Sequence, residues 1–135
     1  MANKLIDVSE LTKKSKDEGL LPQPHQPTYK LALVEIYVEN AKGNPGGSDK
    51  LTNGHRFDSI PIANGMIENG MSCQIVNYVK EEHQKFFNVL KRFDGVIVRC
   101  NPGQINADGG DQNAFDESML KLSKKIPVWP TADVI

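Results

Sequence analysis

The sequence has little cysteine, little histidine and no surplus of charge of either sign. Its 16 basic and 17 acidic residues give a formal net charge of −1. Proteins that bind nucleic acid by neutralising phosphates usually carry a basic surplus or stripe, so we expect no nucleic-acid partner. The three histidines, His25, His55 and His83, lie far apart in the chain and form no metal-ligand spacing, so no metal site is expected.

The two cysteines, Cys73 and Cys100, match neither a zinc motif nor a redox pair. Each lies in or beside a predicted strand, where an unpaired cysteine is usually a small buried apolar residue. We therefore expect buried free thiols and, by default, the reducing environment of the cytoplasm.

Long hydrophobic runs and hydrolase motifs are also absent. No segment approaches the roughly 20 apolar residues of a membrane span, and the polar N-terminus has no signal-peptide core. The chain contains no GxSxG, CxxC or HExxH pattern. We therefore expect no membrane partner and predict no catalytic residue.

Residues 93–103 are the stretch around which the chain is organised. The run Val96-Ile97-Val98 is apolar without alternation, which is typical of a central strand buried on both faces of a parallel sheet. Polar residues follow at once, and ligands of open α/β sheets bind where such strands end. Arg99, Asn101 and Gly103 are therefore candidate substrate-binding residues.

Residues 1–28 are predicted to form an N-terminal arm with a proline-rich linker. Leu5, Val8 and Leu11 recur at helical spacing, and Ser9 could cap a short helix that ends near Lys16. Three prolines between positions 22 and 27 exclude a helix there and favour an extended path. The arm is either a strap pinned to the domain surface by its leucines (Leu5, Leu11, Leu20 and Leu21) or a disordered linker.

Residues 29–135 are predicted to form one small doubly wound, Rossmann-like α/β domain. Strand patterns cover residues 29–38, 71–79, the run around Ile97, and 126–129; helical patterns cover 58–70, 81–92 and 114–124. This alternation predicts a three-layer sandwich with about four parallel strands and helices on both faces. The simplest order places the second strand on one side of the first and the others on its opposite side. After Pro130 a helix is expected to begin and remain unfinished, so we expect a domain truncated at its C-terminus.

Several further polar residues are candidates for the site at the strand ends. Glu35, inside the first strand, either faces an edge or surface groove or stands at the mouth of the site. Glu39 and Asn40 follow that strand and are substrate-binding candidates. His55 and Arg56 precede the helix at 58–70 and are either anion-binding residues or solvated loop residues.

Arg99 has two interpretations of equal weight. A guanidinium forms bidentate pairs with carboxylates and phosphates, so it could hold such a group of a substrate. Alternatively it forms a structural ion pair, for instance with Glu35 on the neighbouring strand.

The last third of the chain resembles the N-terminal, pre-ATP-grasp domain of carboxylate–amine ligases such as glutathione synthetase and D-alanine–D-alanine ligase. The first two strands resemble that domain only in their layout. The residues that carry the resemblance are Asp94, Val96, Ile97, Val98, Arg99, Asn101, Pro102, Gly103, the stretch 126–130 and the stretch 132–135.

The resemblance implies a substrate-binding domain for a small carboxylate or amine that is not catalytic alone. In that family the ATP-binding lysines, the magnesium-binding acids and the Gly-rich lid follow this domain, and none follows Ile135. We therefore expect no cofactor in this chain, with ATP and Mg²⁺ bound only by a missing C-terminal domain of a parent ligase. The alternatives are a stand-alone α/β small-molecule-binding domain or a protein-interaction domain, including a homodimer or docking through the first 28 residues.

Overall fold

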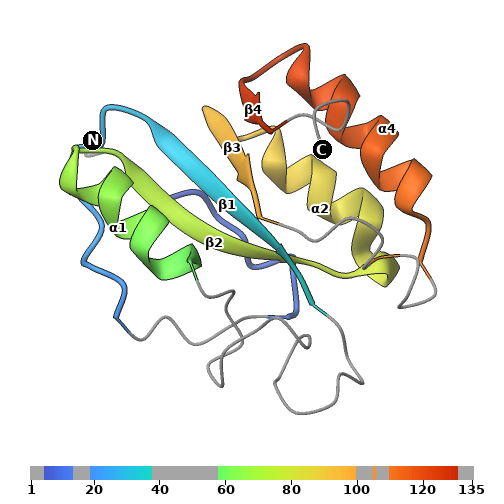
Figure 1. The fold of residues 1–135 in the computed structure, drawn as a ribbon, viewed down its shortest axis with the longest axis horizontal. Helices are drawn as coiled ribbons and strands as arrows, with labels where there is room; N and C mark the ends of the chain where they lie inside the picture. Colours follow the sequence, from blue (N-terminus) through green and yellow to red (C-terminus); the bar gives the residue numbers. More distant parts are fainter. Residues whose placement is uncertain (1–4, 14–18, 38–57, 100–104, 106–109, 131–135) are drawn as a thin grey trace.

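A computed structural model describes residues 5–13, 19–37, 58–99, 105 and 110–130. Four parallel strands form one sheet in the order β2-β1-β3-β4. These are β1 (Lys30–Ile36), β2 (Ser72–Tyr78), β3 (Gly95–Val98) and β4 (Val128–Trp129). Helices lie on both faces of the sheet (Figure 1), which confirms the predicted doubly wound α/β fold and the predicted strand order.

β1 is one of the two interior strands, because it pairs with β2 along one edge and with β3 along the other. Leu33 lies opposite Ile75 of β2 and Ile97 of β3. Residues 32–36 of β1 are buried without interruption, as the apolar pattern predicts for a strand covered on both faces.

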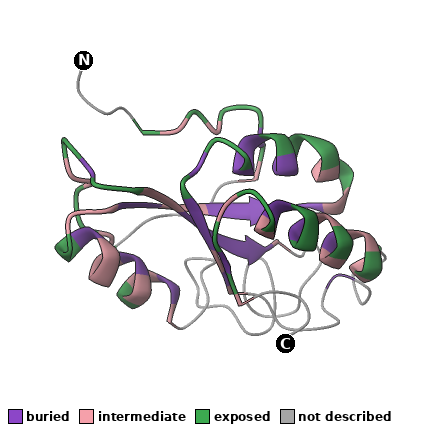
Figure 2. Ribbon diagram, turned by 90° about the horizontal axis from the view of Figure 1, so that it is seen from above, coloured by how far each residue is buried: buried purple, intermediate pink, exposed green. Residues whose placement is uncertain are grey.

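One face of the sheet is covered by two helices, α2 (His83–Leu90) and α4 (Gln112–Ser123). A single 3₁₀ turn, η1 (Lys80–Glu82), precedes α2, so the helix predicted at 81–92 begins later than expected. α4 begins two residues earlier than predicted, because the carboxylate of Asp111 accepts a hydrogen bond from the amide of Ala114 at 3.0 Å. The larger core lies under these helices (Figure 2).

The other face is covered by α1 (Ser59–Glu68), which packs mainly on β2 and also contacts Leu33 and Glu35 of β1. Ala63 and Ile67 of the helix contact a small core around Leu33 and Cys73. Gly70, with a φ of +87°, ends the helix as predicted. Ile97 of β3 is only half-buried, since α1 leaves this part of the sheet face open.

Residues 5–13 show that the predicted short helix from Ser9 is wrong in its described part. They run in an irregular path with one turn at Ser9. The side-chain amide of Gln74 donates to the carbonyl of Ile6 and accepts from its amide N–H, both at 2.9 Å. Leu11 is buried, and Val8 packs beside it on the larger core. These apolar residues thus pack on the sheet domain individually. The arm bonds to β2 through Ile6, and within the arm the amide of Leu11 donates to the carbonyl of Val8 at 3.0 Å.

Within residues 19–28, the side chain of Gln23 pairs with the free edge of β2. The side-chain amide of Gln23 accepts from the amide of Cys73 at 2.9 Å and donates to its carbonyl at 2.8 Å. An exposed strand edge is otherwise a template for aggregation, and this pairing caps it locally. The described parts of the arm therefore form a strap, although Leu5 and Leu21 remain exposed.

The helices in the described part of the chain are too short or too polar to span a bilayer.

Candidate functional site

Glu35 lies near the carboxyl end of β1, at the switch point between β1 and β3. It is fully buried, so its expected position at an edge or in a surface groove is wrong. The reason is that β1 has a strand on each side and the start of α1 on the face toward which Glu35 points. The hydroxyl of Ser59, the first residue of α1, donates a hydrogen bond to the Glu35 carboxylate.

Arg99 directly follows β3 at the same edge of the sheet. Its amide donates to the carbonyl of Val34 at 2.8 Å, which extends the pairing of β3 with β1. Its guanidinium forms an ion pair with Asp58, the N-cap residue of α1. The two side chains are 26% and 41% exposed, so this pair lies at the boundary between core and solvent. The Nε of Arg99 is buried and has no hydrogen-bond partner among the residues that the structure describes.

The carboxylates of Asp58 and Glu35 both lie at the N-terminus of α1. The aligned peptide dipoles place partial positive charge there, which favours negative groups. Arg99 adds a full positive charge that faces Asp58. From the sequence, Asp58 and Ser59 were only the first two residues of the helix predicted at 58–70. A pattern of residues could not reveal that Ser59 bonds to a carboxylate 24 positions away.

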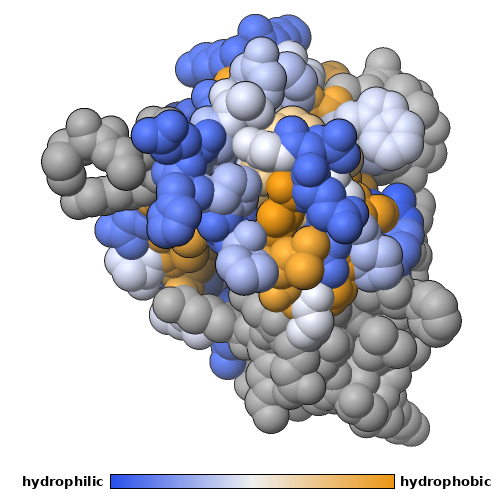
Figure 3. All heavy atoms as spheres, turned by 90° about the vertical axis from the view of Figure 1, so that its left-hand side faces the viewer, coloured by the Kyte–Doolittle hydropathy of each residue, from blue (hydrophilic) through white to orange (hydrophobic). Residues whose placement is uncertain are grey.

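An apolar groove of about 750 Å³ runs along the open face of β3 and β4, with Arg99 among its lining residues. Trp129, which is 67% exposed, also lines it. The other apolar residues of the lining are Leu31, Ile62, Met66, Val96, Ile97, Pro127 and Val128. On the side of the molecule shown in Figure 3, hydrophobic residues are exposed at the surface and are bordered by hydrophilic residues.

The groove has the size of a small-molecule binding site. Its volume lies within the range of about 300–1,000 Å³ that is usual for small-molecule pockets. Its described lining contains one guanidinium, no histidine, no cysteine and no carboxylate. The hydroxyl of Ser123 donates to the carbonyl of Leu120 within its own helix. Over the described ranges, no group of three or more potential metal-ligating side chains occurs. A ligand with an apolar body and one anionic end matches these walls.

The remaining predicted site residues lie outside the part of the chain that the structure describes. They are Glu39, Asn40, His55, Arg56, Asn101 and Gly103.

Of the two cysteines, Cys73 is a buried free thiol as predicted, and burial raises its pKa to about 12. Cys100 also lies outside the described ranges.

The groove itself was missed by sequence reasoning. Ile97 and Trp129 were assigned to strands, but a strand pattern does not show which part of a sheet face a helix leaves uncovered. The one available signal in the sequence was Trp129 itself, with Pro130 directly after it and Pro127 two residues before it. No protein-family model, curated protein or solved structure matches the chain, so the geometry of the groove carries the functional argument.

Proposed function

We propose that the chain is a ligand-binding α/β domain that holds a small carboxylate substrate and is not catalytic by itself. This role corresponds to that of the domain preceding the ATP-grasp fold in carboxylate–amine ligases. The observation that supports it is the position of Arg99, at the switch point of the sheet and in the wall of an apolar groove. Ligands of doubly wound sheets bind at this point.

The guanidinium of Arg99 has the capacity to hold a carboxylate. One of its terminal nitrogens pairs with Asp58, and its Nε has no described partner. A ligand carboxylate can share or replace the Asp58 contact and add a charge-assisted hydrogen bond from the guanidinium. The apolar body of the ligand then lies against residues such as Ile97 and Trp129.

The groove predicts how affinity depends on the ligand. Each methylene group that is buried contributes about 0.8 kcal/mol, which is about a fourfold gain in affinity. In calorimetric titrations of straight-chain carboxylates from butanoate to octanoate, affinity should rise by up to this factor per carbon until the groove is full. Primary amides of the same length should bind more weakly, because they carry no charge for Arg99.

Arg99→Gln tests whether the guanidinium is the anchor. It should abolish the preference for the carboxylate over its amide. Arg92→Gln is the matched control, since Arg92 is an exposed arginine paired with Glu10 on the strap, at 2.8 Å. Equal binding of acids and amides by the unmodified chain, or equal losses in the two variants, would contradict the proposal.

The relation to ATP-grasp enzymes is tested separately. Titration of the chain with ATP and Mg²⁺ should give no binding, because the nucleotide site belongs to the domain that follows in that family. Binding of Mg·ATP with the carboxylate preference intact would remove the ATP-grasp relation and leave a stand-alone small-molecule-binding domain.

A second candidate function is a protein-interaction domain, and the exposure of Trp129 favours it. An open apolar sheet face with an exposed tryptophan is typical of a surface that another polypeptide covers. Sedimentation velocity over a concentration series tests the simplest partner, a second copy of the chain. Dimerisation that Trp129→Ala abolishes would support this function, whereas a monomer at all concentrations would exclude the homodimer.

A further inference from the structure

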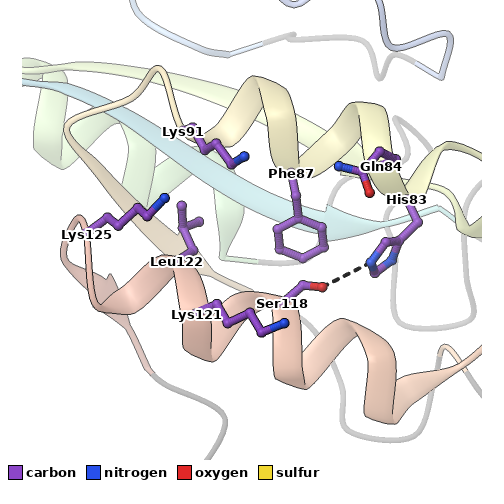
Figure 4. Close-up of a pocket in the computed structure, with 8 residues that line it drawn as sticks. All are labelled: His83, Gln84, Phe87, Lys91, Ser118, Lys121, Leu122 and Lys125. Carbon is purple, nitrogen blue, oxygen red and sulfur yellow. Dashed lines mark hydrogen bonds between the residues drawn. The ribbon is translucent and has the colours of Figure 1, made fainter.

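A second pocket lies on the opposite side of the sheet, between α2 and α4, and has a volume of about 260 Å³. Phe87 and Leu122, both buried, contribute its apolar surface. His83 and Ser118 contribute its polar end, and three lysines complete most of the lining. In Figure 4 the side chains from the two helices extend toward the space between them.

The imidazole of His83 is fixed by two hydrogen bonds. Its Nδ1 lies 2.7 Å from the hydroxyl of Tyr78, and its Nε2 lies 3.1 Å from the hydroxyl of Ser118. Burial, reinforced by the charges of Asp111 and Glu81, raises the pKa of Tyr78 to about 12. Tyr78 therefore remains a neutral phenol at physiological pH.

One arrangement of protons satisfies both hydrogen bonds of His83 with Tyr78 as a donor. A buried neutral phenol keeps its hydrogen bonded, and the acceptor within reach is Nδ1 of His83. The proton of the imidazole is then on Nε2, which donates to the oxygen of Ser118. In this arrangement His83 is not a base for Ser118. The serine hydroxyl keeps its own proton and can donate it to a ligand in the pocket.

The remaining polar lining is cationic. Lys91 follows α2, Lys121 lies in the last turn of α4, and Lys125 lies just beyond α4. No ammonium group of these three forms an ion pair or hydrogen bond within the described part of the chain. The lining residues given for this pocket include no carboxylate. Three positive charges and a hydroxyl donor thus border one small pocket with an apolar base.

We propose that the pocket between α2 and α4 binds a small phosphate monoester. Lysines act as point charges toward phosphate groups, and a monoester dianion offers three strong acceptor oxygens. The apolar side chains Phe87 and Leu122 receive the organic part of the ligand. Arg99 on the opposite face has the planar fork that suits a carboxylate, so the two sites differ in ligand class.

The alternative is that the lysines only complement the negative ends of the helix dipoles. The chain offers matched controls for this alternative. Lys124 is the C-cap residue of α4, so it lies at the same helix end as Lys121 but does not line the pocket. A dipole effect alone would make Lys124 and Lys121 equivalent. Lys85, in the first turn of α2, does not line the pocket either and controls for the loss of an exposed lysine.

The experiment is a titration of the full chain with phenyl phosphate, followed by calorimetry and by NMR of the His83 ring. We expect the His83 signals to shift on binding. Lys91→Gln and Lys121→Gln should each lower the affinity by about threefold and together by about tenfold, while Lys85→Gln and Lys124→Gln leave it unchanged. Benzoate and inorganic phosphate should bind more weakly, because the first lacks the dianion and the second lacks the apolar body.

Three results would overturn the proposal: no shift of the His83 signals at saturating phenyl phosphate, equal losses in pocket and control variants, or tighter binding of benzoate than of phenyl phosphate. Arg99→Gln distinguishes this site from the carboxylate groove. The Arg99→Gln substitution should leave the affinity for phenyl phosphate unchanged. If the variant no longer binds phenyl phosphate, the phosphate binds in the groove and the second site is refuted.

Discussion

Replacement of Asp58 by asparagine should increase the affinity of the groove for carboxylates. Asp58 pairs with Arg99, so a ligand carboxylate must compete with it for the guanidinium. Both side chains are partly exposed, and pairs of this kind are worth about 0.2–1 kcal/mol. Removal of this competition should strengthen binding by about 1.4- to 5-fold.

The same substitution should lower the stability of the chain. It removes the ion pair and also a negative charge at the N-terminus of α1, which together are worth about 0.5–2 kcal/mol. Asp58→Asn should therefore unfold at a lower urea concentration and yet bind hexanoate more tightly. A general loss of structure would weaken binding, so the two changes have opposite signs only if Asp58 competes with the ligand.

Asp111→Asn is the control for this prediction. Asp111 is also an N-cap residue, its carboxylate caps α4, and asparagine can replace it as a cap. Its substitution should leave hexanoate affinity unchanged. An affinity that falls in Asp58→Asn, measured by calorimetry on the folded variant, would refute the assignment of Arg99 as the anchor.

Three further predictions concern the surroundings of the site. Ser59→Ala should lower the free energy of unfolding by about 1.5–3 kcal/mol in urea titrations, because the buried Glu35 carboxylate loses a hydrogen-bond donor; an unchanged midpoint would contradict this. Gln74→Ala should accelerate hydrogen exchange at the Ile6 amide while the amides of β1 stay protected; unchanged exchange at Ile6 would show that the strap is held by other contacts. Stability should fall as the pH rises from about 9 toward 12, because the buried Cys73 thiol keeps its proton in the folded state while the unfolded chain loses it; urea midpoints that stay constant over this range would contradict it.

The sheet could be predicted because its evidence is local. The run Val96-Ile97-Val98 and the alternation of strand and helix patterns fix a parallel sheet, and the rules for crossovers then select the observed strand order. Within the arm, only the short helix was predicted incorrectly, because the spacing of Val8 and Leu11 fits a helix as well as the strap that was the other prediction. The side-chain amide of Gln74, more than 60 positions away, decides between them.

The site was predictable only in part, because its geometry depends on tertiary contacts. Topology alone brings Glu35 and Arg99 to the same switch point, and the structure places them there. The partner carboxylate of Arg99 comes from Asp58, on a helix that the strand pattern does not position. The groove exists because α1 packs on β1 and β2, so the lining residue Ile97 is left half-buried.

The most direct test of the central claim is an NMR titration of the chain with hexanoate that follows two side-chain signals. These are the Nε–H of Arg99 and the indole N–H of Trp129, both from residues that line the groove. We predict that both signals shift with one common dissociation constant, and that hexanamide shifts neither to the same extent. Signals that stay in place while hexanoate binds elsewhere would contradict the claim that this groove is a carboxylate site.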